Sequence, residues 1–279
     1  IVIRELELDD HHRINADLLK KHIDVDKHAG LNPFMVIASA GTTDTGAVDP
    51  LNEIGDIAKS HQMWFHIDGA YGGFFILTKR AKEKFKGIEK ADSLVIDPHK
   101  GLFLPYGLGA VLVKDKDALF HSHHYTANYM QDANNPDLPL NPADVSPELT
   151  KHFRGLRLWL PLQIHGIDPF IACLEEKLYL TDYFREELVK RGFNVGPEPD
   201  LSVSYFWYPS KGVDENVFNQ KLMEMIHDDG RIFLSSTKIN GKQVIRIAIL
   251  SFRTKKETID VCLEMIDRCL QKTKFHFGI

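Results

Sequence analysis

Two short apolar segments end in side chains that could do chemistry together. Asp68 follows the apolar run at 63–67, and Lys100 follows a second run at 93–96 by four residues. Ligands of open α/β sheets bind outside the carboxyl ends of the strands, so this acid and this amine would face one crevice. A lysine amine forms Schiff bases with aldehydes, and a buried carboxylate can keep a pyridine nitrogen protonated. The pair therefore predicts a pyridoxal phosphate site.

Both residues also have ordinary structural explanations. An aspartate directly after a strand is commonly a turn former or a helix cap, and a lysine in a loop is ordinarily solvated. The spacing of Asp68 and Lys100 alone therefore leaves the choice open between a cofactor site and two unrelated surface residues.

The elements that would position these residues alternate between strand-like and helix-like patterns. Short apolar runs interleaved with amphipathic helices are typical of a parallel sheet that is covered on both faces. The expected strands lie at 33–38, 63–67, 93–96 and 110–113, and the expected helices lie at 15–24, 51–60 and 79–86. The segment 121–147 follows, is rich in Asn and Pro residues and lacks apolar periodicity, which is typical of a functional or mobile loop.

A smaller α+β unit is expected after the sheet. Its pattern predicts helices at 170–191, 214–228 and 255–272, a strand at 202–208, and a hairpin pair at 232–235 and 244–249 around Asn240-Gly241. With 279 residues and roughly 150 residues per domain, about two domains are expected. We place the large domain at 1–167 and the small C-terminal domain at 168–279.

Composition excludes several classes of protein. Acidic residues outnumber basic ones by 39 to 34, so the net charge of −5 gives no electrostatic reason to bind nucleic acid or an anionic membrane. No run approaches the ~18 apolar residues of a membrane span. The three cysteines are not in CxxC spacing, which favours a reducing, cytoplasmic location and gives no metal signature.

The wording of the motifs is more specific than their spacing. HIDGAYGG at 66–73 and ADSLVIDPHKG at 91–101 closely resemble the signature of the group II pyridoxal-phosphate-dependent amino acid decarboxylases, which include the aromatic amino acid, tyrosine, histidine and glutamate enzymes. Matching stretches occur in order at 40–51, 128–132 and 153–166. The resemblance implies a type I pyridoxal-phosphate fold, of the aspartate aminotransferase kind, and loss of a substrate carboxylate as carbon dioxide.

The resemblance also implies roles for individual residues. Lys100 matches the lysine that binds the cofactor aldehyde, Asp68 matches the acid at the pyridine nitrogen, and Ala70 matches the small residue on one face of the ring. Thr43 matches a threonine near the cofactor, although a turn hydroxyl is the ordinary alternative.

The two residues before the lysine match polar cofactor-binding positions. His99 could contact the phosphate or the substrate side. Asp97 stands where some members have Asn, and it would repel a phosphate that it faced, so the expected role of Asp97 is a supporting one.

The segment 121–147 resembles the mobile catalytic loop of the family. Tyr129 matches the tyrosine that returns a proton to the substrate after carbon dioxide leaves, and a phenol can donate a proton without carrying standing charge. Members without that tyrosine tend toward oxidative deamination, so Tyr129 favours a simple decarboxylase. A loop aromatic packed on the surface is the alternative. Histidines at 121, 123 and 124 are expected in a solvated loop rather than at a metal.

Two arginines bear on the substrate. Arg246 matches an arginine that meets the substrate carboxylate in glutamate decarboxylase-like members, whereas a structural ion pair is the equally weighted alternative. Arg154 agrees with the aromatic-type members, which slightly favours an aromatic amino acid as substrate. Gly101 stands where many members have Trp, which weakens that preference.

Family chains normally begin well before the residue that matches Ile1. The preceding parts would supply the arm that clasps the partner subunit, the phosphate loop and a histidine that stacks on the cofactor. We therefore expect a homodimer or a complementary chain that carries the N-terminal half, with weak cofactor binding by this segment alone. Two alternatives stay open: another type I reaction, such as that of a lyase or desulfurase, and a non-catalytic regulatory or dimerisation subunit.

Overall fold

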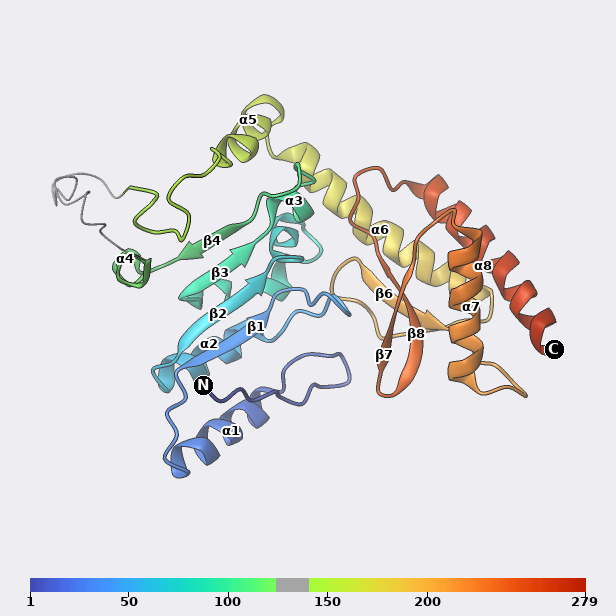
Figure 1. Cartoon of the computed structure of the whole chain (residues 1–279), viewed down its shortest axis with the longest axis horizontal. Coiled ribbons are helices and arrows are strands. Elements are labelled where there is room, and N and C mark those ends of the chain that lie inside the picture. The colour runs from blue at the N-terminus through green and yellow to red at the C-terminus, as the bar shows by residue number, and fades with distance from the viewer. Residues whose placement is uncertain (124–140) are drawn as a thin grey trace.

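The computed structural model describes residues 1–123 and 141–279 and contains two sheets side by side (Figure 1). The first half of the chain forms α1 (Ala16–His28), β1 (Met35–Ser39), α2 (Leu51–Ser60), β2 (Trp64–Gly69), β3 (Ser93–Ile96), α3 (Pro98–Gly101), β4 (Ala110–Val113) and α4 (Lys116–His123). The second half forms α5 (Gly155–His165), α6 (Asp168–Lys190), β5 (Asn194–Val195), β6 (Val203–Trp207), α7 (Glu215–Asp229), β7 (Ser235–Ile239), β8 (Lys242–Ala248) and α8 (Lys256–Phe277).

The first sheet has the order β1-β2-β3-β4. Strands β1, β2 and β3 are parallel, which confirms the expected parallel-rich sheet, and β4 runs antiparallel to β3. The reversal of β4 follows from its short connection, because only α3 and a loop separate it from β3, whereas a parallel strand needs a crossover of a dozen or more residues. The expected helix at 79–86 is wrong: short 3-10 turns occupy this region, with η1 at Gly73–Leu77, η2 at Lys82–Phe85 and η3 at Ile88–Lys90.

The second sheet is antiparallel throughout and has the order β5-β6-β8-β7. The Asn240-Gly241 turn joins β7 to β8 as expected, and both turn residues have positive φ, at 51° and 76°. Strand β7 begins at Ser235, three residues later than the predicted start at Ile232. Helices α6, α7 and α8 pack with this sheet around buried side chains such as Phe184, Phe218 and Ile266.

Helix α6 packs into the cores of both sheets. Its first half places Leu174 and Leu178 in the cluster that contains the buried residues of β1, β2 and α2, whereas Phe184 and Leu188 lie in the core of the second sheet. One continuous helix of 23 residues therefore fixes the two sheets relative to each other. Among the described residues, no helix is long and apolar enough to cross a membrane.

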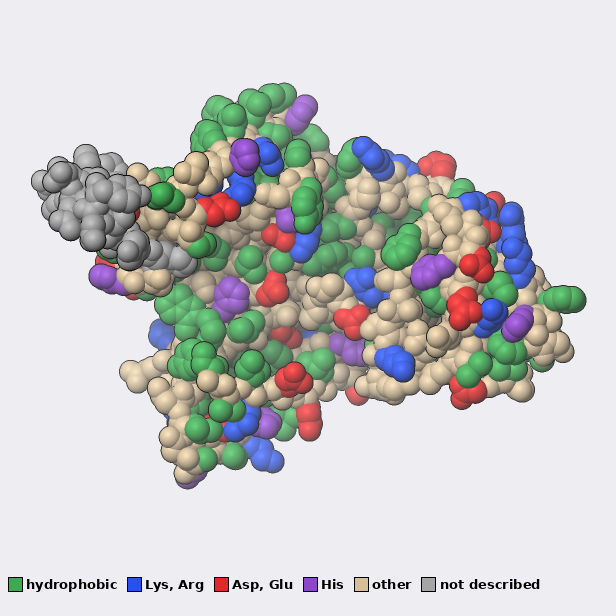
Figure 2. Space-filling view, in the orientation of Figure 1, with side chains coloured by type: hydrophobic (Ala, Val, Ile, Leu, Met, Phe, Trp, Pro, Cys, Tyr) green, Lys and Arg blue, Asp and Glu red, His purple; other side chains and the backbone are tan. Residues whose placement is uncertain are grey.

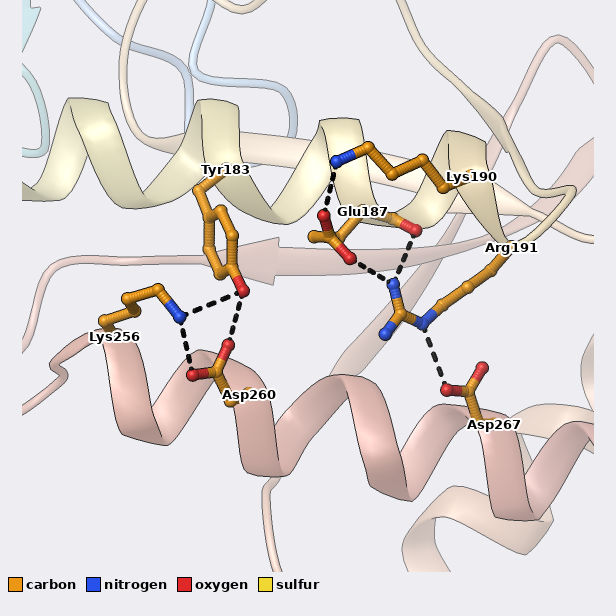
Figure 3. A network of polar contacts seen from close by, with 7 residues as sticks. All are labelled: Tyr183, Glu187, Lys190, Arg191, Lys256, Asp260 and Asp267. Carbon is orange, nitrogen blue, oxygen red and sulfur yellow. Dashed lines mark hydrogen bonds and ion pairs between the residues drawn. The ribbon is translucent and has the colours of Figure 1, made fainter.

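A polar network fastens the solvent side of α6 to α8 (Figure 3). The Tyr183 hydroxyl donates to Asp260 Oδ1 at 2.6 Å, and Lys256 Nζ donates to Asp260 Oδ2 at 2.8 Å. At the C-terminal end of α6, Arg191 Nε donates to Asp267 Oδ2 of α8 at 3.0 Å. Exposed pairs of this kind contribute ~1 kcal/mol or less each, so the buried core rather than this network supplies most of the adhesion between the helices.

A buried carboxylate joins the N-terminal segment to the start of β6. Asp200 Oδ1 accepts from Arg13 Nη2 at 2.5 Å and from Lys84 Nζ at 2.6 Å, and Asp200 Oδ2 accepts from the Val48 amide at 2.9 Å. Burial raises the pKa of Asp200, but these hydrogen bonds outweigh burial and hold the pKa below its ordinary value. The ionised carboxylate therefore ties together three segments of the first half of the chain.

We expect Asp200→Asn to lower the free energy of unfolding by about 2 kcal/mol at neutral pH, because it removes charge-assisted hydrogen bonds from a buried acceptor. A group with a depressed pKa stabilises the fold above its unfolded-state value, here 3.8, and that contribution is lost as pH falls through the folded-state pKa. The difference between variant and wild type, measured by denaturant unfolding, should therefore shrink below pH 3.8. Glu198→Gln, at an exposed position two residues away, is the matched control. Equal losses in both variants would contradict the assignment.

Candidate functional site

The predicted acid lies where the sheet brings it, at the carboxyl end of β2. Asp68 pairs with Ser39 of β1 on one side and with Val95 of β3 on the other. Its Oδ1 accepts a hydrogen bond of 3.0 Å from the Ala70 amide, which fixes the carboxylate over the turn that follows the strand. Asp68 is exposed and Ala70 is half-buried, so both remain reachable for a ligand at this edge.

The predicted lysine follows the neighbouring strand. Helix α3 starts after β3, with Asp97 as its N-cap residue and Pro98 in the first turn, where a fixed φ and a missing N–H are tolerated. One turn places Lys100 Nζ 2.8 Å from Asp97 Oδ2. The i, i+3 spacing of these two residues is a sequence signal for this ion pair. Since β2 and β3 are parallel neighbours, Lys100 and Asp68 belong to the same edge of the sheet.

His99 has a fixed ring orientation beside this ion pair. Its Nδ1 lies 2.7 Å from the Leu108 carbonyl, and because a carbonyl only accepts, Nδ1 carries the hydrogen. Its Nε2 lies 3.9 Å from Asp97 Oδ2, and Tyr106 packs edge-on at 5.3 Å between ring centroids. The structure thus brings Asp97, His99 and Lys100 together at one end of β3.

The turn after β2 is packed too closely for larger residues. A Cβ atom at Gly72 would lie 2.1 Å from the Ala40 carbonyl oxygen, and one at Gly73 would lie 2.7 Å from Ile96 Cγ2. Tyr71, which directly precedes Gly72, is buried and shares a hydrogen bond of 2.7 Å with the Ser202 hydroxyl. Burial raises the pKa of Tyr71 to about 12. This link between the GAYGG motif and the residue before β6 was not predicted from the sequence. The only sequence signal for it is Tyr71, an aromatic residue with a polar hydroxyl inside the motif.

Thr43 and Arg246 meet each other, although not through the side chain of Thr43. Thr43 lies exposed in the loop after β1, and its backbone carbonyl accepts a hydrogen bond from Arg246 Nη2. Arg246 Nε also donates to the Asp44 carbonyl at 2.8 Å, and Nη1 donates to the Ser235 hydroxyl at 3.1 Å. These acceptors are neutral. The contacts of Arg246 in the described residues are therefore not the ion pair that the sequence analysis gave as the alternative to a substrate-binding role.

Two further predictions concern the region after β4. Tyr129 lies outside the described residues, as does most of the expected loop 121–147. Arg154 Nη1 donates to Glu148 Oε2 at 2.7 Å, and this hydrogen bond raises the pKa of Arg154. Among residues 1–123 and 141–279, no group of three or more metal-ligating side chains comes together.

The donor set at the sheet edge fits a pyridine aldehyde. An amine that can bind an aldehyde, a carboxylate on the adjacent strand end and a small residue, Ala70, beside that carboxylate suit the aldehyde and the ring of such a cofactor. Comparison with known proteins agrees with this chemistry. The conserved domain of pyridoxal-dependent decarboxylases matches residues 1–209. The chain belongs to this family.

Individual decarboxylases resemble the chain over most of its length. An aromatic-L-amino-acid decarboxylase from Bacillus atrophaeus is 36% identical over 91% of this chain and 54% of its own length, and tryptophan decarboxylase 2 from Oryza sativa subsp. japonica is 30% identical over 91% and 52%. The crystal structure of mouse CSAD in apo form superposes with a TM-score of 0.86 at 27% identity, over 95% of this chain and 58% of that one. This family member thus spans about half the length of these relatives, and its fold is that of type I pyridoxal-phosphate enzymes.

We expect Gly72→Ala to lower the free energy of unfolding by roughly 1–3 kcal/mol, because the new methyl group overlaps a backbone oxygen that cannot move aside easily. Thermal or denaturant unfolding of the full chain measures the effect. Gly155→Ala is the matched control, since its Cβ would make only ordinary contact, at 3.6 Å, with Phe153. A neutral Gly72→Ala would show that the turn is not held against β1 as described.

Proposed function

We propose that this family member takes part in the pyridoxal-phosphate-dependent decarboxylation of an L-amino acid to an amine and carbon dioxide, with an aromatic substrate favoured. The observation that carries the proposal is that Asp68 lies near the carboxyl end of β2 while the Asp97–Lys100 pair follows the carboxyl end of β3, its parallel neighbour. The names of similar proteins support the substrate class, because they include aromatic amino acid, tryptophan and tyrosine decarboxylases. The reaction would make the protein a carboxy-lyase.

Each residue of the site would have a distinct task. When bound, pyridoxal phosphate supplies an electron sink for the bond that breaks. Lys100 Nζ would hold the cofactor through its aldehyde, and Asp97, 2.8 Å away, would orient that amine. Asp68 would keep a proton on the ring nitrogen, while Ala70 would leave room for the flat ring.

The remaining predicted residues would act around this core. His99, with its Nδ1 donating to the Leu108 carbonyl, would present Nε2 toward the phosphate or the substrate, and Thr43 would lie near the cofactor. Tyr129 would return a proton to the substrate carbon. The role of Arg246 as a ligand of the substrate carboxylate stays a prediction, and its contacts support a second role that is argued below.

We also propose the division into a large domain at 1–167 and a small domain at 168–279, with the catalytic loop at 121–147 in the large domain. Separate hydrophobic clusters around the two sheets support two units. A reducing, cytoplasmic location is proposed from the three cysteines, which are free thiols.

The site proposal predicts where the cofactor is trapped. Borohydride reduction of the protein with pyridoxal phosphate should place a pyridoxyl group on Lys100, and peptide mass mapping locates that group. Lys100→Ala should abolish the label. It should also abolish the release of carbon dioxide from a panel of aromatic amino acids. Lys211→Ala, at an exposed lysine far along the sequence, should change neither. A label that persists elsewhere in Lys100→Ala contradicts the role of Lys100.

The same panel separates the proposed function from its alternatives. Amine and carbon dioxide in equal amounts support a decarboxylase. An aldehyde product would instead indicate the chemistry named for the phenylacetaldehyde synthase of Arabidopsis thaliana, which is 29% identical over 91% of this chain. Cofactor trapping without turnover of any amino acid would favour a regulatory subunit.

A partner segment is the last part of the proposal. Strand β1 lies at one end of its sheet, and Met35 and Ile37 of this strand are exposed together with Phe34, which precedes it. They lie beside a groove of about 570 Å³ that the first residues of the chain also line. Helix α5 has no buried residue and exposes Trp159, and Figure 2 shows hydrophobic side chains gathered over it at the top of the molecule. Contiguous apolar surface of this kind marks an interface.

We propose that the half of the relatives' length absent from these 279 residues covers these surfaces, whether it stands on the same polypeptide or on a second chain, and that the assembly is dimeric. That half would supply the phosphate contacts. The 279-residue chain alone should therefore bind pyridoxal phosphate at least ~10-fold more weakly than the completed assembly, a difference of about 1.4 kcal/mol, as measured by fluorescence titration.

Ile37→Lys should reduce the increase in pyridoxal phosphate affinity that the missing half produces, because it places a charge on the open edge of β1. Val25→Lys, at an equally exposed position of α1, should not reduce that increase. A fully active species of 31.8 kDa without a companion would contradict this part of the proposal.

A further inference from the structure

The loop that follows β1 stands directly beside the candidate acid. Its first residue, Ala40, donates its amide to the Asp68 carbonyl at 2.7 Å, so the loop leaves the sheet beside the last two residues of β2. The chain then turns at 42–46 and returns through Val48, which forms a bridge back to Ala40. The loop therefore starts and ends beside the strand end that carries Asp68.

The base of the loop is clamped by the segment that enters the second sheet. A Cβ atom at Gly41 would lie 2.7 Å from Leu201 Cδ1, and one at Gly46 would lie 2.9 Å from Val203 Cβ, so backbone and side chains are in close contact there. The Val48 amide donates to Asp200. These contacts fix the two ends of the loop and leave its exposed tip, Thr43 and Asp44, beyond them.

The tip is held by two side chains of the β7–β8 hairpin, some 200 residues away in the sequence. Arg246 binds the consecutive carbonyls of Thr43 and Asp44 through Nη2 and Nε, while its Nη1 is tied to Ser235 of β7. Thr237 Oγ1 donates to Asp44 Oδ2 at 3.1 Å. A planar guanidinium suits this task, because its rigid fork of donors can meet two neighbouring oxygens at once.

We propose that Arg246 is a positioning residue: it straps the tip of the 42–46 loop to the second sheet and so sets where Thr43 stands relative to Asp68. In the protein without substrate, the guanidinium donors of Arg246 bind the loop carbonyls and the Ser235 hydroxyl. The second sheet thereby controls the geometry of the first sheet's carboxyl edge. The consequence for catalysis rests on the proposed function, whereas the strap itself does not.

Amide hydrogen exchange in the full chain without cofactor tests the strap. The loop amides of Thr42 and Gly46 are hydrogen-bonded to the Ala47 and Thr42 carbonyls, so they report on opening of the loop. In Arg246→Gln, peptides that cover 42–46 should exchange about tenfold faster, because charge-assisted hydrogen bonds are lost. Arg246→Lys should restore part of the protection, since an ammonium reaches one carbonyl more readily than two. Lys238→Gln removes an exposed charge from the same hairpin and should change nothing.

Each outcome decides the proposal. Unchanged exchange in Arg246→Gln overturns the strap and leaves Arg246 to the substrate carboxylate, which would then show as a raised KM with little change in kcat. Faster exchange with a lowered kcat at near-constant KM supports the strap. If the full protein releases no carbon dioxide at all, the proposed function fails while the exchange result still stands. Should Arg246→Gln not fold, Thr237→Val, which removes the second contact at the tip, should accelerate exchange in the same peptides to a smaller degree.

Discussion

The parallel register between β2 and β3 is the constraint on which the candidate site depends. It sets Asp68 opposite Val95 and Gly69 opposite Ile96, so the residues that follow β3 continue past the carboxylate of Asp68. Because side chains alternate along a strand, a slip of one residue would turn Asp68 to the other face of the sheet. Buried neighbours such as Phe65 and Ile67 oppose such a slip, since it would expose them.

The β2–β3 register alone does not set the direction of the Lys100 side chain. Helix α3 is a single turn, and its Asp97 carboxylate draws the flexible Lys100 side chain back along the axis, while the Leu108 carbonyl fixes His99 next to it. The sheet therefore sets the position of the site, and the short helix sets the direction of its reactive amine. Preorganisation of this kind limits the conformational freedom that a long lysine side chain would otherwise lose on binding a ligand.

Local patterns were enough to predict the parts of the site that lie near each other in the sequence. The apolar runs predicted β3 and β4 with their observed bounds, and the Asn240-Gly241 turn was predicted correctly. The helix at 79–86 was wrong, because this segment forms only the 3-10 turn η2 at Lys82–Phe85, and Gly87, with a φ of 95°, turns the backbone before η3. Contacts between distant segments, such as Asp200 with Arg13, left no periodic signal, since nothing in either local pattern specifies the other.

The same distinction explains why Arg246 was the hardest residue to interpret. Its family match pointed to a carboxylate, and its strand position was clear, but its partners are backbone carbonyls from a loop that sequence patterns do not place. A backbone acceptor exists at every residue, so no residue type at 43 or 44 marks the contact. The two sheets share α6, the buried Asp200 and this arginine. Because all three connect the same two sheets, contacts with the second sheet help to position the edge that carries Asp68 and Lys100. The strands of the first sheet position it as well.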